Sequence, residues 1–157
     1  MNEPQTSRPL QGLLDDVDGG SAVLAMSPED FVYIDRDCEA FKLVIQNIMN
    51  IMVSVADVED WRIGDKNPDM VSAGAVVKRF RTKAKGSSGD NSVHAVMEQH
   101  LQIVEDIQQV HRMARQRMSD TDSTFAAEFD RLSQTLPERP AVGVPFGPYI
   151  LPDGSAR

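Results

Sequence analysis

The sequence holds few of the residues that build disulfide frameworks, metal sites or aromatic cores. Its single cysteine, Cys38, cannot form an internal disulfide. Aromatic residues make up 6% of the chain, and the three histidines, at positions 94, 100 and 111, are not spaced three or four residues apart, as zinc ligands on one helix face would be. The scarcity of these residues argues against a disulfide scaffold and a zinc centre, and we expect no bound metal.

Basic residues are also in the minority, 16 against 24 acidic ones, for a formal net charge of −8. Nucleic acid requires a basic face, so we expect no nucleic-acid partner. Only residues 67–91 are basic, with a run from Lys78 to Lys85. We interpret this run as a solvated helix end or, alternatively, as a docking patch for an acidic partner or a membrane surface.

Neither a signal peptide nor a membrane span is predicted. The first residues lack a basic start followed by an apolar stretch. The most apolar stretch, Val44 to Val58, is short and interrupted by polar residues. We therefore expect synthesis in the cytoplasm and, if the protein is exported, a route that needs no cleavable leader.

Catalytic patterns are missing as well. Gly86-Ser-Ser-Gly lacks the Gly-Lys-Ser/Thr ending of a phosphate loop. Cys38 falls on an apolar seam and is expected to be a small buried hydrophobe rather than a nucleophile, and the acid pair Glu105-Asp106 is expected to lie on the solvated surface. We expect no enzyme and no cofactor; a helical enzyme is a third reading, which a bound metal or cofactor would support.

What the sequence does contain is helical periodicity. Ser27-Pro28-Glu29-Asp30 has the composition of a helix start with a capping box. Apolar residues then recur at steps of three and four, which predicts a helix over 28–58; they are Phe31, Ile34, Cys38, Phe41, Ile45, Ile48, Met52 and Val55.

Two further helices follow. Gly64 and Pro68 break the first pattern, and Asn67-Pro68 predicts a new start and a helix over 68–84. After the loop at 86–91, Asn91 or Ser92 caps a third helix over 92–134, about 65 Å long, in which residues 119–123 allow a kink. The predicted fold is all-α: a helical hairpin with an additional short helix, pairing into a four-helix-type bundle.

The breaks in this pattern predict three parts. Residues 1–26 contain Gly and Pro breakers and are expected to be a flexible N-terminal tail with at most one helical turn. Residues 27–135 form the helical hairpin domain. Residues 136–157 contain five prolines and are expected to be a Pro-rich, extended C-terminal tail.

Trp61, the only tryptophan, lies between two predicted helices, three residues before Gly64. One interpretation is an apolar plug that seals the corner between the helices. The other is a resemblance: a helix followed by a Trp-and-Gly turn is similar to the ESX/WXG-type small helical proteins of type VII secretion. The family turn is Trp-x-Gly, whereas Trp61-Arg62-Ile63-Gly64 has one more residue.

The last predicted helix carries a second likeness. His100, Ile107 and His111 match the family pattern of two histidines eleven residues apart with a hydrophobic residue between them. The acid that the pattern places at position 104 is Val104 here, with Glu105 one step later. Tyr149 and Asp153 have the spacing of the family's tail signal, although Pro152 lies between them, and Tyr33 and Asp37 share that spacing.

The resemblance implies a type VII secretion-associated substrate or partner that acts by helix–helix dimerisation, as a homodimer or as a heterodimer with another helical protein, and contacts the secretion machinery. Trp61 and Gly64 would shape the turn, and the tail would complete the signal. We expect the apolar seams to pair through Phe31, Phe41, Phe125 and Phe129. The alternative is a cytoplasmic helical adaptor or regulatory protein that oligomerises without export.

Overall fold

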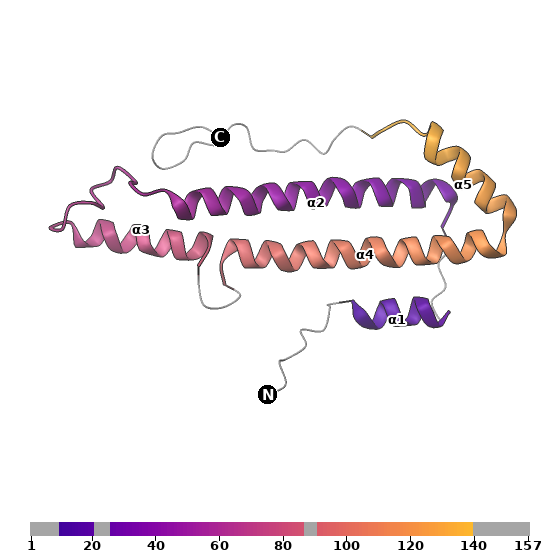
Figure 1. Cartoon of the computed structure of the whole chain (residues 1–157), viewed down its shortest axis with the longest axis horizontal. Coiled ribbons are helices and arrows are strands. Elements are labelled where there is room, and N and C mark those ends of the chain that lie inside the picture. Colours follow the sequence, from indigo (N-terminus) through magenta and orange to yellow (C-terminus); the bar gives the residue numbers. More distant parts are fainter. Residues whose placement is uncertain (1–9, 21–25, 87–90, 140–157) are drawn as a thin grey trace. The chain divides into compact units, whose positions relative to one another are not determined.

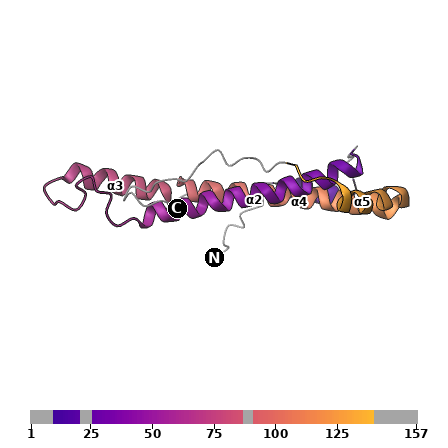
Figure 2. The ribbon, with the colours of Figure 1, turned by 90° about the horizontal axis from the view of Figure 1, so that it is seen from above.

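The computed structural model describes residues 10–20, 26–86 and 91–139, and in this part of the chain it contains five helices and no strand (Figure 1). They are α1 (Gln11–Gly19), α2 (Pro28–Asp57), α3 (Val71–Ala84), α4 (Val93–Thr121) and α5 (Ser123–Thr135). Figure 2 shows α2 to α5 from a second direction. The predicted all-α class is confirmed, and α2 packs against α4 as in a hairpin.

The chain divides into two compact units. Of the described residues, the first contains 10–20, 26–43 and 101–139, and the second contains 44–86 and 91–100. The first unit therefore holds all of α1 and α5, the start of α2 and most of α4. The second unit holds all of α3, the end of α2 and the start of α4.

The start of α2 confirms the predicted capping box. The Ser27 hydroxyl accepts a hydrogen bond from the Asp30 amide (3.2 Å), and the Asp30 carboxylate accepts one from the Ser27 amide (3.0 Å). The Asp30 carboxylate also accepts a hydrogen bond from the Ser27 hydroxyl (2.7 Å), and this bond, followed by the one from the Ser27 amide, lowers the pKa of Asp30 from its ordinary value. The helix start is therefore satisfied locally, by residues adjacent in sequence.

The first unit has a continuous apolar core. Phe31 and Phe125 meet edge to face, with ring centroids 5.8 Å apart and planes at 82°. The buried members of this core are Leu14, Val17, Phe31, Val110, Ala114 and Phe125. Met26, Met113, Met118 and Phe129 pack around it. This core joins α1, α2, α4 and α5.

The N-terminal segment differs from our prediction, because α1 is a helix of nine residues rather than at most one turn. Leu14 and Val17 bury one side of it, at 5% and 3% exposure. Gly20 adopts a left-handed conformation (φ 75°) and its amide bonds to the Asp16 and Val17 carbonyls, which ends the helix. Gly20 is therefore a helix cap rather than the helix breaker that the sequence predicts.

The predicted third helix is in fact two helices. α4 ends at Thr121, Asp122 has an extended backbone, and α5 begins at Ser123. The Asp122 carboxylate accepts hydrogen bonds from the amides of Thr124 (2.8 Å) and Phe125 (3.2 Å), so it caps a new helix. The prediction of one 65 Å helix was therefore wrong, since α4 has 29 residues and is about 44 Å long.

The other predicted helix starts are partly confirmed. Ser92 caps α4, because its hydroxyl accepts from the Ala95 amide (3.2 Å). α3 begins at Val71, three residues later than expected from Pro68. The Asn67 side chain instead accepts from the Asp69 amide (3.0 Å), which makes a local turn before the helix.

The acid pair Glu105-Asp106 was predicted to be solvated, and for Asp106 this is wrong. Its side chain is fully buried, at 0% exposure, whereas Glu105 is exposed. Asp106 lies four and eight residues before the buried Val110 and Ala114, so it occupies the face of α4 that is turned into the core. Cys38 is buried as predicted, and burial is the main reason that the pKa of its thiol is raised.

We predict that the docking of α1 contributes measurably to stability. Leu14→Ala should lower the free energy of unfolding by about 2–4 kcal/mol, because it removes a buried side chain from the core. Leu13→Ala is the matched control: the neighbouring side chain is 43% exposed, so its truncation should change stability by about 0.5 kcal/mol or less. Urea unfolding followed by circular dichroism measures both, and equal effects would contradict a packed α1.

Candidate functional site

The segment between α2 and α3 contains the residues singled out by the family resemblance. Arg62 (φ 56°) is the single non-glycine residue with positive φ in the described part of the chain, and Gly64 follows at φ 89°. A Cβ at Gly64 would collide with the Met70 sulfur. Glycine is therefore favoured at position 64 by its positive φ, and a larger residue would also have to displace the flexible Met70 side chain.

Side chains and backbone groups hold this turn in place. The Trp61 amide donates to Asp65 (3.3 Å), the Arg62 amide donates to Asp60 (2.8 Å), and the Asn67 amide donates to the Gly64 carbonyl (3.0 Å). The connection covers residues 58–70, so it is longer than the tight turn that the resemblance implies. The predicted turn residues do lie together, but in an extended loop.

Trp61 is half-buried and packs on Phe80 of α3, with ring centroids 5.8 Å apart and an interplanar angle of 30°. Arg81, one residue further along α3, donates through Nη2 to the Val58 carbonyl just after α2. These two contacts fasten α3 to the loop. This position fits the interpretation of Trp61 as an apolar plug between the helices. The contact does not test whether the turn has the function of the ESX/WXG-type turn.

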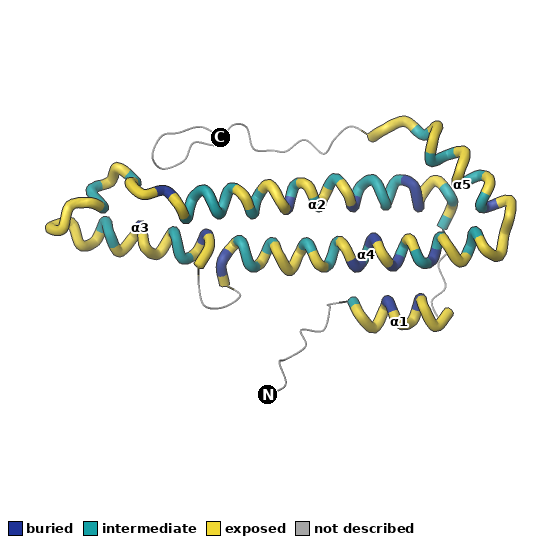
Figure 3. Tube along the Cα trace, in the orientation of Figure 1, coloured by how far each residue is buried: buried dark blue, intermediate teal, exposed yellow. Residues whose placement is uncertain are grey.

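The second unit has many exposed apolar side chains and a small core. Figure 3 shows α3 mostly exposed or half-buried. Buried hydrophobic residues of this unit are Ile45, Val58, Val77 and Ala84. Its large hydrophobic residues that are exposed are Ile63, Met70, Val71, Val76, Phe80, Val93 and Val96. We call these seven residues the exposed apolar set.

The end of α2 adds to this surface. From Ile48 to Ala56 every residue except the exposed Asn50 is half-buried, and none is fully buried. A helix that is apolar on most of its circumference is normally covered on all sides. The second unit covers this part of α2 only in part.

The four phenylalanines predicted to anchor a partner have different environments. Phe31 and Phe125 are 2% and 8% exposed and belong to the core of the first unit. Phe129 is half-buried against that core, with the Arg115 guanidinium over its ring at 4.6 Å. Phe41 is 54% exposed. Of the four, Phe41 therefore has the accessible ring that a partner contact requires.

The family-like motif on α4 is also dispersed. His100 is exposed, Ile107 is half-buried, and the His111 Nδ1 lies 2.7 Å from the Ile107 carbonyl oxygen. The His111 ring meets Phe31 edge to face at 6.3 Å. His111 thus has a packing role within the first unit. Tyr149 and Asp153 lie outside the described residues.

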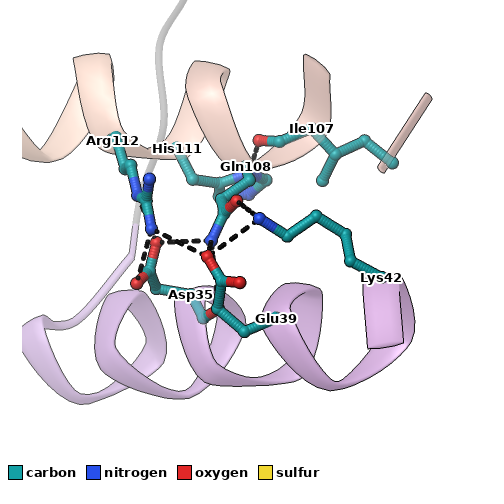
Figure 4. A network of polar contacts seen from close by, with 7 residues as sticks. All are labelled: Asp35, Glu39, Lys42, Ile107, Gln108, His111 and Arg112. Carbon is teal, nitrogen blue, oxygen red and sulfur yellow. Dashed lines mark hydrogen bonds and ion pairs between the residues drawn. The ribbon is translucent and has the colours of Figure 1, made fainter. Parts of the chain in front are cut away.

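A polar clamp joins α2 and α4 in the first unit, which the sequence had not indicated (Figure 4). Arg112 donates to both carboxylate oxygens of Asp35, from Nε to Oδ1 and from Nη2 to Oδ2 (3.1 Å). Its Nη2 also donates to Glu39 (3.3 Å). The buried Gln108 donates to Glu39 (2.9 Å) and accepts from Lys42 (2.9 Å). This clamp fixes the antiparallel register of the two helices.

The clamp changes the acid–base properties of its members. Hydrogen bonds from Lys42 and Gln108 lower the pKa of Glu39 from its ordinary value, with a smaller contribution from the charge of Arg112. The hydrogen bond to Asp35 is the main reason that the pKa of Arg112 is raised. Both shifts favour the charged forms, so the clamp is built to stay ionised near neutral pH.

Within the described residues, no group of three or more His, Cys, Asp or Glu side chains is arranged to hold a metal ion. α2 is long and apolar enough to cross a membrane, judged by length and composition alone, and core helices and signal sequences meet the same criterion. The sequence argument against a membrane span considered only Val44 to Val58, whereas α2 runs from Pro28 to Asp57. The expected absence of a membrane span therefore stays a prediction.

Comparisons of this chain with protein-family models, curated proteins and solved structures find no match. The likeness to ESX/WXG-type proteins therefore depends on the turn and helix residues described above.

We predict that Gly64 is required for the turn. Gly64→Ala should lower the free energy of unfolding by more than about 1 kcal/mol, because alanine is strained at φ 89° and meets Met70. The matched control is Gly74→Ala in α3, where a Cβ meets nothing within 4 Å and should stabilise the helix by about 1 kcal/mol. Thermal unfolding of both variants gives the comparison, and stabilisation by both would contradict the described turn.

The polar clamp predicts a pH dependence. The folded pKa of Glu39 is below its unfolded value, so its stabilising contribution is present above the unfolded pKa and is lost as pH falls through the folded one. Glu39→Gln should cost under about 1 kcal/mol at pH 7, since its side chain is half-exposed, and progressively less as the solution is acidified below about pH 4.5.

The control for this experiment is Glu98→Gln, an exposed acid on α4 that has no ion pair among the described residues. Urea unfolding between pH 3 and pH 7 measures both variants. A penalty for Glu39→Gln that does not vary with pH would show that the charge of Glu39 is not what stabilises the clamp.

Proposed function

We propose that this protein is a helical pairing protein that works by burying its exposed apolar set, together with the end of α2, against a second helical chain. The observation that carries the proposal is the contrast between the seven exposed large apolar residues of the second unit and its four buried ones. Burying apolar surface is the main favourable term in association. A second copy or a different helical protein would complete a four-helix-type bundle.

The biological setting that we favour is type VII secretion, in which the chain acts as an ESX/WXG-like substrate or as a partner of one. The support is the combination of Trp61 and Gly64 in the loop that follows α2, with φ 89° at Gly64 and the Trp61 ring against Phe80. In this role the loop contributes part of an export signal recognised together with the partner. The protein has no catalytic role and takes no cofactor in this proposal.

The second candidate is a cytoplasmic helical adaptor that pairs in the same way and is not exported. The longer connection at residues 58–70 favours it, because the tight family turn is replaced by a loop that Trp61 seals against α3. Both candidates predict pairing. Only the type VII secretion candidate predicts that export depends on Trp61.

Pairing is tested by Val76→Glu. Val76 is 45% exposed on α3, so a charge there should leave helicity intact and weaken association by tenfold or more, by placing an unpaired charge in an apolar interface. Leu13→Glu is the matched control, since Leu13 is 43% exposed but lies on α1 in the first unit. Sedimentation velocity over a range of concentrations compares them, and the proposal fails if Val76→Glu associates like the parent protein.

Export is tested separately, in cells with a type VII system. Trp61→Ala should abolish the appearance of the protein in the medium, whereas Trp61→Phe, which can keep the ring contact with Phe80, should retain part of it. Cell-associated protein is measured in parallel to exclude degradation. Export of neither protein would favour the adaptor, whereas equal export of the parent and Trp61→Ala would contradict a role of Trp61 in the export signal.

A further inference from the structure

A pocket in the second unit lies between the end of α2, the following loop and α3, with a volume of about 660 Å³. This is within the usual range of ligand-binding pockets. We call it the α3 pocket. The side chains that matter here are Asp57, Glu59, Asp65, Lys78, Arg81 and Lys85. All of its lining residues belong to the second unit, and the exposed residues Val76 and Phe80 are not among them.

One wall of the pocket is basic. Lys78 and Arg81 are three residues apart on α3 and so project from the same side of the helix. Lys85 directly follows α3, has an extended backbone and also lines the pocket. Lys78 and Lys85 are exposed, and neither makes an ion pair or a side-chain hydrogen bond within the described part of the chain. These charges are available to a ligand.

The rest of the lining carries three acids and one further lysine. Asp57 and Glu59 lie where α2 ends, and Asp65 and Lys66 lie in the loop. No ion pair connects these acids to the cations of α3 among the described residues, although both sets line the same pocket, whereas the first unit contains all six ion pairs found in that part of the chain. Opposite charges that face one pocket without pairing leave room for a molecule between them.

Two buried polar atoms at the pocket have no hydrogen-bond partner within the described residues: Arg81 Nε, a donor, and Asp65 Oδ1, an acceptor. Buried polar groups are normally hydrogen-bonded, because an unpaired one costs free energy. A peptide group offers both a carbonyl acceptor and an N–H donor, whereas a phosphate or sulfate ion at neutral pH offers acceptors for the most part. Both atoms are themselves buried, so a ligand reaches them only if the two side chains move; a polypeptide offers the acceptor and the donor that would then pair with them.

Gly74 points to the same kind of ligand. It lies inside α3, where glycine costs about 1 kcal/mol relative to alanine, and it lines the pocket. A Cβ there would meet nothing within 4 Å, so no packing within the chain requires glycine. Glycine does allow the backbone of another chain to approach closely.

We infer that the α3 pocket binds an acidic polypeptide segment of the helical partner, with carboxylates beside Lys78, Arg81 and Lys85 and backbone near Gly74. The inference rests on the proposed function, because the acidic segment belongs to the chain that covers the exposed apolar set. It adds a charge requirement: the partner presents acids next to α3. Salt should weaken this contact, as exposed charges are screened.

The test uses the full chain and fluorescein-labelled hexaglutamate, with hexaglutamine as the uncharged peptide and inorganic phosphate as the competing anion. Fluorescence anisotropy measures binding, and Trp61 emission provides a second readout, because the Trp61 amide bonds to Asp65 of the pocket. We expect hexaglutamate to bind, hexaglutamine not to bind, and phosphate to compete only at a concentration at least tenfold higher.

The double variant Lys78→Gln/Lys85→Gln should weaken hexaglutamate binding by about tenfold. Its matched control is Arg79→Gln/Lys83→Gln, which removes the same charge from the same helix outside the pocket and should change affinity by less than twofold. Gly74→Leu should fill the pocket and abolish binding without unfolding α3, since the position opens into free space. Circular dichroism confirms the fold of each variant.

Other outcomes would overturn the inference. Equal losses in the two double variants would mean that net charge alone attracts the peptide, and competition by equimolar phosphate would mean a site for small anions. Sedimentation of the same variants separates this inference from the proposed function. If association persists while Lys78→Gln/Lys85→Gln and its control bind hexaglutamate equally, the inference about the pocket is wrong and the pairing stands. Pocket-specific binding by a chain that never self-associates would support the pocket and contradict pairing with a second copy.

Discussion

α2 carries apolar side chains around more of its circumference than one neighbouring helix can cover, and the rest of the structure depends on how that surface is buried. At its N-terminal end the problem is solved within the chain: Phe31 is enclosed by α1, α4 and α5 and is 2% exposed. At its C-terminal end, from Ile48 to Ala56, most residues are half-buried. Since exposed apolar surface is costly in water, this end is where a second chain has most to gain by binding.

The polar contacts follow the same division. In the first unit, charged residues are used up internally: Arg112 holds Asp35 and Glu39, and Arg139 lies 3.0 Å from Asp37 and stacks over the Tyr33 ring at 3.8 Å. In the second unit, Lys78 and Lys85 face acids across a pocket without pairing to them. The first unit therefore makes all the ion pairs found among the described residues, although Phe41 is exposed there, and the second unit keeps more apolar groups and unpaired charges available for recognition.

Local patterns predicted local structure well and long-range packing poorly. The Ser27 capping box and the seam of α2 could be read from spacing because neighbouring residues determine them. A kink within residues 119–123 was expected, but the full break at Asp122 was not, because the apolar spacing continues through it; the Asp122 side chain alone caps the new helix. Asp106 and Gln108 are buried although both are polar. The one hint in the sequence is that Asp106 lies four residues before the apolar Val110, which places the two on the same helix face. The pocket beside α3 combines residues from three segments, so no single motif reveals it.

Amide hydrogen exchange, measured on the purified chain at several concentrations, tests most directly the claim that the second unit depends on a partner. Exchange reports local opening, so a thinly packed region exchanges fast unless something covers it. Our account predicts strong protection in α4 and α5 of the first unit at every concentration, and protection of α3 and of residues 44–57 that is weak at low concentration and increases only with self-association or with an added helical partner. Protection of α3 equal to that of the first unit in a dilute monomer would contradict the account.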